Sequence, residues 1–198
     1  MIINENILQA MGAEIENYNI SENIFSEGDT PNHYYQIVEG KVKLNNYNEE
    51  GKEILQNILE KGQSIGESLL FMDKSYPMNA VTTTNCKILK LPKAQFFKML
   101  EKYPETWMDI NRFISENLYF KQIMTQNMCS QSPAVKLKIL MDYLKSSNRV
   151  KEPFSYQIPF TRQQMANLTG LCVETTIRTL KVMEKKNILK IRNRKILY

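Results

Sequence analysis

Residues 161–181 contain two short helical patterns separated by a glycine, and this spacing is typical of a helix–turn–helix. Thr161 is followed three residues later by Gln164, which matches a capping box and predicts that a helix begins there. Gly170 lies at the break, where a left-handed turn favours a residue without a Cβ atom. Ala166 is small at the position where two such helices cross closely. This stretch constrains the fold of the chain more than any other.

The second predicted helix begins at about residue 173 and separates charged from apolar side chains. Four residues recur at helical spacing and are expected to share one face: Glu174, Ile177, Arg178 and Lys181. Three apolar residues are expected on the opposite, buried face: Val173, Leu180 and Met183. A charged stripe backed by an apolar stripe suits a recognition helix in the major groove of DNA. The alternative is an ordinary αα-hairpin on a protein surface.

The distribution of charge supports double-stranded DNA as the partner. Residues 133–198 hold 14 Lys and Arg against four Asp and Glu, a net charge of +10. Residues 1–132 hold 12 Lys and Arg against 17 Asp and Glu, a net charge of −5. A short basic segment that carries a helix–turn–helix is the electrostatic signature of phosphate binding. The alternative is a solvated basic face without a partner.

Composition favours a cytoplasmic, globular protein without a membrane partner. The chain has 198 residues, of which 42% are hydrophobic, and it lacks an apolar run near the ~18 residues that a membrane span requires. Its first residues show neither the basic nor the apolar region of a signal peptide. Cys86, Cys129 and Cys172 are too few and too scattered for a disulfide framework, which indicates a reducing compartment.

The first half predicts a β-roll. The glycines at 28, 40, 51 and 62 lie 11–12 residues apart, a spacing typical of short strands joined by turns. Five segments carry β-branched or aromatic strand residues: 34–38, 42–44, 54–58, 80–84 and 87–91. Pro92 ends the last of them, and residues 94–102 have helical spacing.

A long helix is predicted from about Glu105 to Met128, and its apolar residues cover more than one face. One side is expected to pack on the roll and the other on the same helix of a second chain, which predicts a homodimer. The alternative is a monomer that buries the helix within one chain. Pro133 marks a hinge, followed by a helix over 134–146 and, after the helix–turn–helix, by strands over 189–192 and 195–198 that turn at Asn193-Arg194.

The expected fold is therefore α+β: an N-terminal double-stranded, jelly-roll-like β-roll, a long dimerisation helix and a C-terminal winged helix–turn–helix. The expected domains are a sensory roll (1–104), the dimerisation helix with its hinge (105–132) and the DNA-binding domain (133–198).

Taken together, the chain resembles the CRP/FNR family of bacterial transcription regulators. The resemblance rests on Glu27-Gly28-Asp29, residues 35–42, Ile65-Gly66-Glu67, residues 161–164 and residues 173–178. It implies a homodimer with a sensory roll, with DNA and RNA polymerase as partners. No enzymatic activity is expected, because a Ser/His or Cys/His site could use only His33 and no carboxylate pair or metal spacing stands out.

The resemblance also implies which residues read DNA. Glu174 and Arg178 match a Glu and an Arg that read a G·C pair and a neighbouring guanine, in agreement with their hydrogen-bonding chemistry. Val173 stands where the cyclic-AMP receptor has a second DNA-reading Arg, so a TGA-like or TTGA-like half-site is expected. Ile177 replaces a frequent Ser or Gly, and it either touches a thymine methyl group or turns into the core. The expected contacts are Thr161, Arg162, Gln163, Cys172, Val173, Glu174, Thr175, Ile177, Arg178 and Lys181.

The region that matches the family's effector pocket comprises Ile65, Gly66, Glu67, Ser68, Tyr76 and Pro77. Gly66-Glu67 matches the pair that contacts ribose, but the Arg-Ser pair that binds the cyclic phosphate is missing from residues 75–79. The first arginine of the chain is Arg112, and a buried phosphate requires a paired cation, best supplied by Arg. Lys74 is the nearest substitute and is expected to be a solvated turn residue. Independence of cyclic AMP is expected, with a cyclic-nucleotide-responsive regulator as the alternative and the effector unknown.

No cofactor or metal is expected. An iron–sulfur sensor needs four cysteines, and none of the three here precedes Cys86. His33, the only histidine, is expected in a solvated turn. Cys172 is expected at the N-cap of the second helix, either as a small capping residue or as a thiol of lowered pKa open to oxidation. A protein-interaction module that does not bind DNA remains the alternative from another functional class.

Overall fold

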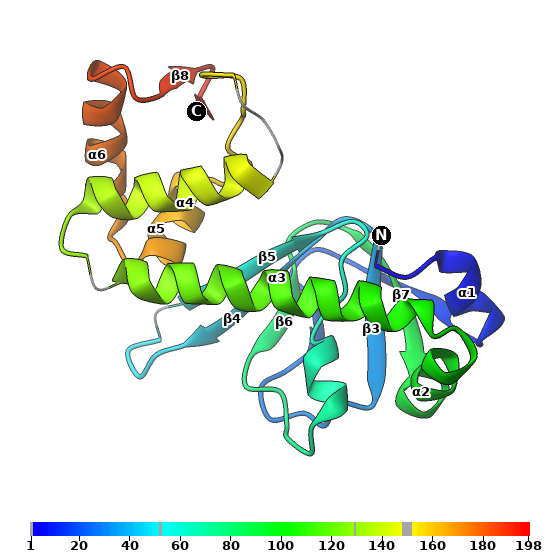
Figure 1. The fold of residues 1–198 in the computed structure, drawn as a ribbon. Helices are drawn as coiled ribbons and strands as arrows, with labels where there is room; N and C mark the ends of the chain where they lie inside the picture. Colours follow the sequence, from blue (N-terminus) through cyan, green and yellow to red (C-terminus); the bar gives the residue numbers. More distant parts are fainter. Residues whose placement is uncertain (1, 52, 129, 148–151) are drawn as a thin grey trace. The chain divides into compact units, whose positions relative to one another are not determined.

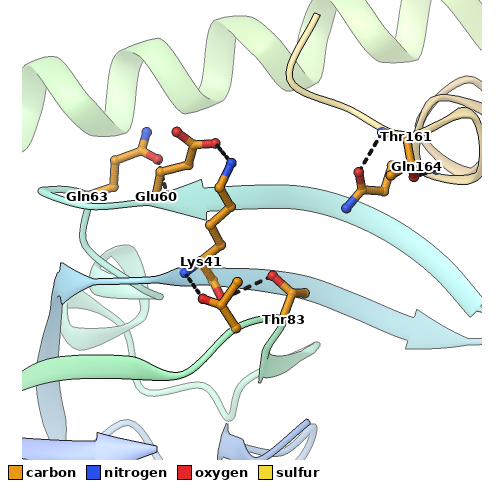
Figure 2. Close-up of polar contacts among 7 residues, drawn as sticks. Lys41, Glu60, Gln63, Thr83, Thr161 and Gln164 are labelled. Carbon is orange, nitrogen blue, oxygen red and sulfur yellow. Dashed lines mark hydrogen bonds and ion pairs between the residues drawn. The ribbon is translucent and has the colours of Figure 1, made fainter. Parts of the chain in front are cut away.

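Two antiparallel β-sheets form the N-terminal part of the chain, as the strand and glycine pattern predicts (Figure 1). The first sheet has the order β1 (Glu14–Tyr18), β7 (Cys86–Pro92) and β3 (His33–Glu39). The second has the order β2 (Asn23–Phe25), β6 (Asn79–Thr82), β4 (Lys41–Tyr47) and β5 (Glu53–Glu60). An ion pair of 2.6 Å joins Lys41 to Glu60 across β4 and β5 (Figure 2).

The chain crosses from one sheet to the other between β3 and β4, at Gly40. This residue has φ of 97°, and a Cβ atom there would lie 2.5 Å from the Asn85 carbonyl oxygen and from Cys86 Sγ. Only glycine fits this crossing, because both the backbone angle and the close approach exclude a side chain.

The roll buries side chains on both sides of the sheet that contains β7. Residues of both sheets that lie between them form one core, which includes Phe25, Tyr35, Ile37, Val42 and Ile88. On the other side α1 (Glu5–Ala10), the short 3-10 helix η1 (Glu67–Phe71) and α2 (Lys93–Lys102) contribute to a second core. There the Tyr34 ring stacks on Phe96, with ring centroids 4.8 Å apart.

The computed structural model describes residues 2–51, 53–128, 130–147 and 152–198, so Cys129 lies outside the described residues. The chain divides into two units, Met1–Glu116 and Asn117–Tyr198, and the division falls inside helix α3 (Glu105–Met128). The first turns of α3 belong to the first unit because Ile110 and Phe113 are buried in the cores of the roll. No helix among the described residues has the length and apolar character needed to cross a membrane.

The second unit contains three further helices and a two-stranded sheet: α4 (Pro133–Ser147), α5 (Arg162–Thr169), α6 (Val173–Lys185), β8 (Lys190–Arg192) and β9 (Lys195–Leu197). Asn193 and Arg194 turn the chain between β8 and β9 with φ of 47° and 62°, the pattern of a type I′ hairpin. This confirms the expected wing. The segment around Tyr156 and Ile158, which the sequence did not predict, pairs with β9 through Ile158 N donating to Ile196 O at 2.9 Å.

Three expectations need correction. His33 is the first residue of strand β3, so it does not lie in a solvated turn. Its imidazole is half-buried, and its pKa is lowered mainly by burial and secondly by the positive charge of Lys90. The strand expected over 80–84 ends at Thr82. Val173 is half-buried, whereas Leu180 and Met183 are fully buried. The difference arises because Val173 is the first residue of α6 and lies at the end of that helix.

Candidate nucleic-acid interface

Helix α5 begins with the capping box that the sequence predicts. Thr161 Oγ1 accepts a hydrogen bond from Gln164 N at 3.2 Å, and Gln164 Oε1 accepts one from Thr161 N at 2.8 Å (Figure 2). Gly170 ends the helix in the left-handed region with φ of 65°. Leu171 N then donates to the carbonyl oxygen of the fully buried Ala166 at 2.9 Å. These contacts confirm the helix–turn–helix.

Helix α6 separates a buried face from an exposed one. Thr176, Leu180 and Met183 are buried. The opposite face carries exposed side chains that line a shallow hollow of about 500 Å³: Glu174, Ile177, Arg178, Lys181, Val182 and Lys185. Ile177 is 39% exposed, so its side chain does not turn into the core, which was one of the two positions considered for it. The structure thus brings four of the predicted DNA-contact residues together on one exposed face.

The wing is attached to both helices of the motif. The Arg162 guanidinium donates through Nη1 to the carbonyl oxygen of Arg194 at the tip of the wing. At its base, Ile191 N donates to Glu184 Oε1 of α6 at 2.9 Å. The predicted contact residue Arg162 therefore already has an intramolecular partner. Arg192 and Arg194 are exposed, so the wing presents two cationic side chains to solvent. The contacts made by Arg162 and Glu184 fix the backbone that carries them.

Cys172 is the N-cap residue of α6, as expected, and it is exposed. Its Sγ lies 2.9 Å from the hydroxyl oxygen of Thr175, and this hydrogen bond is the main cause of a lowered pKa of the thiol. Gln163, another predicted contact, is exposed on α5, where its Nε2 donates to Asn167 Oδ1 at 2.9 Å. Both residues are accessible at the start of their helices.

The predicted effector region lies in the roll, and aromatic rings of the chain itself fill the space above Gly66. The Phe25 and Tyr76 rings stack with centroids 3.6 Å apart and planes 8° from parallel. A Cβ atom on Gly66, which has φ of 68°, would lie 2.8 Å from Tyr76 Cε1 and 3.1 Å from Phe25 Cζ. Phe25 and Tyr76 are 5% and 2% exposed, so neither ring is open to solvent.

The other members of the effector region differ in exposure. Ile65 and Glu67 are buried, and Glu67 accepts a hydrogen bond from Ser64 Oγ at 2.7 Å. Ser68 is half-buried and Pro77 is exposed. Lys74, the nearest substitute for a phosphate-binding arginine, is exposed. Within the described parts of the chain, no group of three or more His, Cys, Asp or Glu side chains is arranged to hold a metal ion.

Two family models match the chain in the same order as its two parts. The model of the cyclic nucleotide-binding domain matches residues 15–103, and that of the Crp-like helix-turn-helix domain matches residues 138–198. The chain belongs to the CRP/FNR family. Among its curated relatives, the cAMP-activated global transcriptional regulator CRP of Haemophilus influenzae is 24% identical over 88% of this chain and 79% of that protein. The transcriptional activatory protein AadR of Rhodopseudomonas palustris is 22% identical over 88% of this chain and 72% of that protein.

Solved CRP/FNR-like structures share the fold along nearly the whole chain. OCPA-complexed CprK matches with a TM-score of 0.79 and 20% identity, over 98% of this chain and 89% of that one. The c-di-GMP responsive global regulator CLP of Xanthomonas campestris matches with a TM-score of 0.76 and 17% identity, over 98% of both chains. The α+β fold with a roll and a helix–turn–helix is thereby confirmed.

As a CRP/FNR protein, the chain is a transcription regulator with a helix–turn–helix DNA-binding domain. The expectation that it is not an enzyme is confirmed, because the members it matches are transcription regulators. Two structural roles were missed from the sequence: Phe25 as the stacking partner of Tyr76, and Arg162 as the anchor of the wing. Neither carries a local signal, because both contacts join residues more than 30 positions apart.

Proposed function

We propose that this CRP/FNR regulator binds DNA as a homodimer, at an inverted repeat with TGA-like half-sites, and that it does so without a cyclic nucleotide. The observation that carries the proposal is the exposed face of α6, where Glu174 and Arg178 lie one turn apart. Glu accepts a hydrogen bond from cytosine N4, and Arg binds guanine O6 and N7 in a bidentate manner. Residues 133–198 act as the DNA-binding domain and residues 1–104 as the sensory roll.

Around this pair, residues at the starts of α5 and α6 and along the exposed face of α6 complete the interface in our proposal. They are Thr161, Arg162, Gln163, Cys172, Val173, Thr175, Ile177 and Lys181. Thr161, Gln163 and Cys172 are exposed near helix N-termini, where backbone N–H groups attract phosphate. The net charge of +10 over residues 133–198 supplies the long-range attraction.

The homodimer is supported by apolar residues of α3 that are exposed in the single chain. Met108, Leu118 and Tyr119 are 66%, 56% and 57% exposed. We propose that residues 105–132 pair with their copy about a two-fold axis, as an inverted repeat requires. Half-site centres are then expected about one helical turn apart, roughly 34–36 Å. Sedimentation equilibrium that shows a stable monomer would contradict the dimer.

Independence of cyclic AMP is supported by two features of the roll. The first arginine of the chain is Arg112, which lies beyond the roll strands, so the roll supplies no guanidinium for a cyclic phosphate. Phe25 and Tyr76 fill the space beside Gly66. The curated CRP relatives are cAMP-activated, which makes a cyclic-nucleotide-responsive regulator the second candidate. Saturable micromolar binding of cyclic AMP in calorimetry would favour that candidate. RNA polymerase is the proposed protein partner.

The test is a titration of the unliganded protein into a labelled inverted repeat with TGA half-sites, against a scrambled duplex, at several salt concentrations. We expect preferential binding that weakens steeply with salt, because phosphate contacts release counterions. Arg178→Ala should cost roughly 1–3 kcal/mol and relax the preference for guanine. Arg192→Ala removes an exposed arginine outside α6 and serves as the matched control, since it should weaken all duplexes alike. Equal, salt-insensitive binding of both duplexes would instead indicate a protein-interaction module.

A further inference from the structure

Helix α6 carries a large apolar side chain on its polar face. Ile177 is 39% exposed, whereas Leu180 and Met183 of the same helix are 1% and 2% exposed. Burial in the core of the unit therefore does not explain an isoleucine at this position. Ile177 follows Glu174 by one turn and directly precedes Arg178, so it lies beside the two residues proposed to read bases.

The surroundings of Ile177 favour nucleic acid as the occupant of this surface. The hollow of about 500 Å³ on α6 is lined by Ile177 and Val182, by the carboxylate of Glu174 and by three cations, Arg178, Lys181 and Lys185, so cations outnumber anions three to one in its lining. A cationic rim favours a polyanion. In the major groove of DNA, the apolar group that a base pair displays is the 5-methyl group of thymine.

Helical geometry then indicates which base is in reach. Ile177 and Arg178 are consecutive residues of α6, and consecutive Cα atoms lie about 3.8 Å apart, close to the ~3.4 Å step between stacked bases. If Arg178 reads the guanine of a TGA half-site, Ile177 faces the adjoining base. An isoleucine in a helix is held in one χ1 rotamer, so its methyl groups are fixed before binding.

We propose that Ile177 recognises the 5-methyl group of the thymine next to the guanine in each half-site. This inference rests on the proposed function of α6 as the recognition helix. It makes Ile177 a determinant of specificity that distinguishes thymine from uracil and cytosine, neither of which carries the methyl group.

The experiment changes the DNA and leaves the protein intact. Each thymine of a symmetric TGA-type inverted repeat is replaced in turn by deoxyuridine, which removes the methyl group and keeps base pairing. We expect deoxyuridine beside the guanine to weaken binding roughly fourfold per half-site, the value of one buried methyl-sized group, and about 15-fold when both half-sites are changed. Deoxyuridine at thymines elsewhere in the duplex should have little effect.

Protein variants identify the side chain responsible. Ile177→Ser should bind thymine and uracil duplexes equally while it keeps its preference over a scrambled duplex. Val182→Ala is the matched control, because Val182 is a 45% exposed apolar residue of the same hollow and lies farther from the helix start, where bases are contacted. It should retain the full discrimination.

The outcomes separate the inference from the function on which it rests. Equal affinity of the wild-type protein for thymine and uracil duplexes, with intact preference for the repeat, would overturn the role of Ile177 alone. Discrimination that persists in Ile177→Ser would assign the methyl contact to another residue and also overturn it. Loss of all preference between repeat and scrambled duplex would refute the proposed function itself.

Discussion

Gly66→Ala tests whether the roll is filled at the position where an effector would lie. The new Cβ atom would lie 2.8 Å from Tyr76 Cε1, and the Tyr76 ring cannot retreat freely because it stacks on Phe25 at 3.6 Å. Two costs add: alanine in the left-handed region costs about 1–2 kcal/mol, and overpacking of a core adds about 1–3 kcal/mol. We expect Gly66→Ala to lower the free energy of unfolding by about 2–5 kcal/mol.

Gly51→Ala is the matched control. Gly51 has a similar φ of 75°, but nothing lies within 4 Å of an added Cβ atom. This variant should therefore show only the backbone cost of about 1–2 kcal/mol. The assay is urea unfolding followed by the fluorescence of Trp107, the single tryptophan, which lies in the first unit with its ring 5.6 Å from Phe71.

A double variant isolates the contribution of the ring. In a Tyr76→Ala background the obstructing atom is absent, so adding Gly66→Ala should cost no more than Gly51→Ala does. Equal destabilisation by Gly66→Ala and Gly51→Ala in the wild-type background would refute the reasoning. It would mean that the space above Gly66 accepts a side chain and is open to a ligand.

Three further predictions concern stability and the wing. Tyr198→Phe removes the hydrogen bond from the Tyr198 hydroxyl to Asp142 and should lower the stability of the second unit by about 1–2 kcal/mol. The assay is thermal unfolding followed by circular dichroism. An unchanged midpoint would show that the hydrogen bond contributes nothing to stability. Burial raises the pKa of Tyr35 to about 12, so the phenolate is disfavoured in the folded roll. The free energy of unfolding, measured by urea unfolding at fixed pH values, should therefore be constant up to about pH 10 and fall between pH 10 and 12. A flat profile over this range would contradict the prediction. Arg162→Lys keeps the charge but loses the planar guanidinium that reaches Arg194, so affinity for the inverted repeat should fall; wild-type affinity would instead assign Arg162 to simple charge attraction.

The parts of the fold that the sequence predicted are those encoded by local signals. Thr161 and Gln164 form both hydrogen bonds of the capping box, and Gly170 ends α5 as expected. Helix α3 has the predicted bounds, Glu105–Met128, because Pro104 and Pro133 limit the pattern on either side. Such signals lie within a few residues of the structure they specify, so a single sequence suffices to find them.

Elements with weak or distant signals escaped prediction. Strand β1 contains Glu14, Glu16 and Asn17, which have low strand propensity, and it is held by its pairing with β7. The six-residue helix α1 is too short to show a periodic pattern. The exposure of Ile177 was left between two possibilities, since only the packing of α6 determines which face is covered. The DNA contacts themselves stay predictions.

The turn at Asn193-Arg194 has a consequence for how this regulator can be engineered. Glycine is the residue favoured second in a type I′ turn, yet the chain has Arg194 at φ of 62°, where an L side chain is strained by about 1–2 kcal/mol. With Arg194 the wing is therefore less stable than it would be with glycine at this position, but it carries one more cation. We expect that introducing glycine here would raise the melting temperature and, by removing a cation from the wing, reduce the attraction to DNA, so that thermostability and DNA affinity would be opposed at this residue.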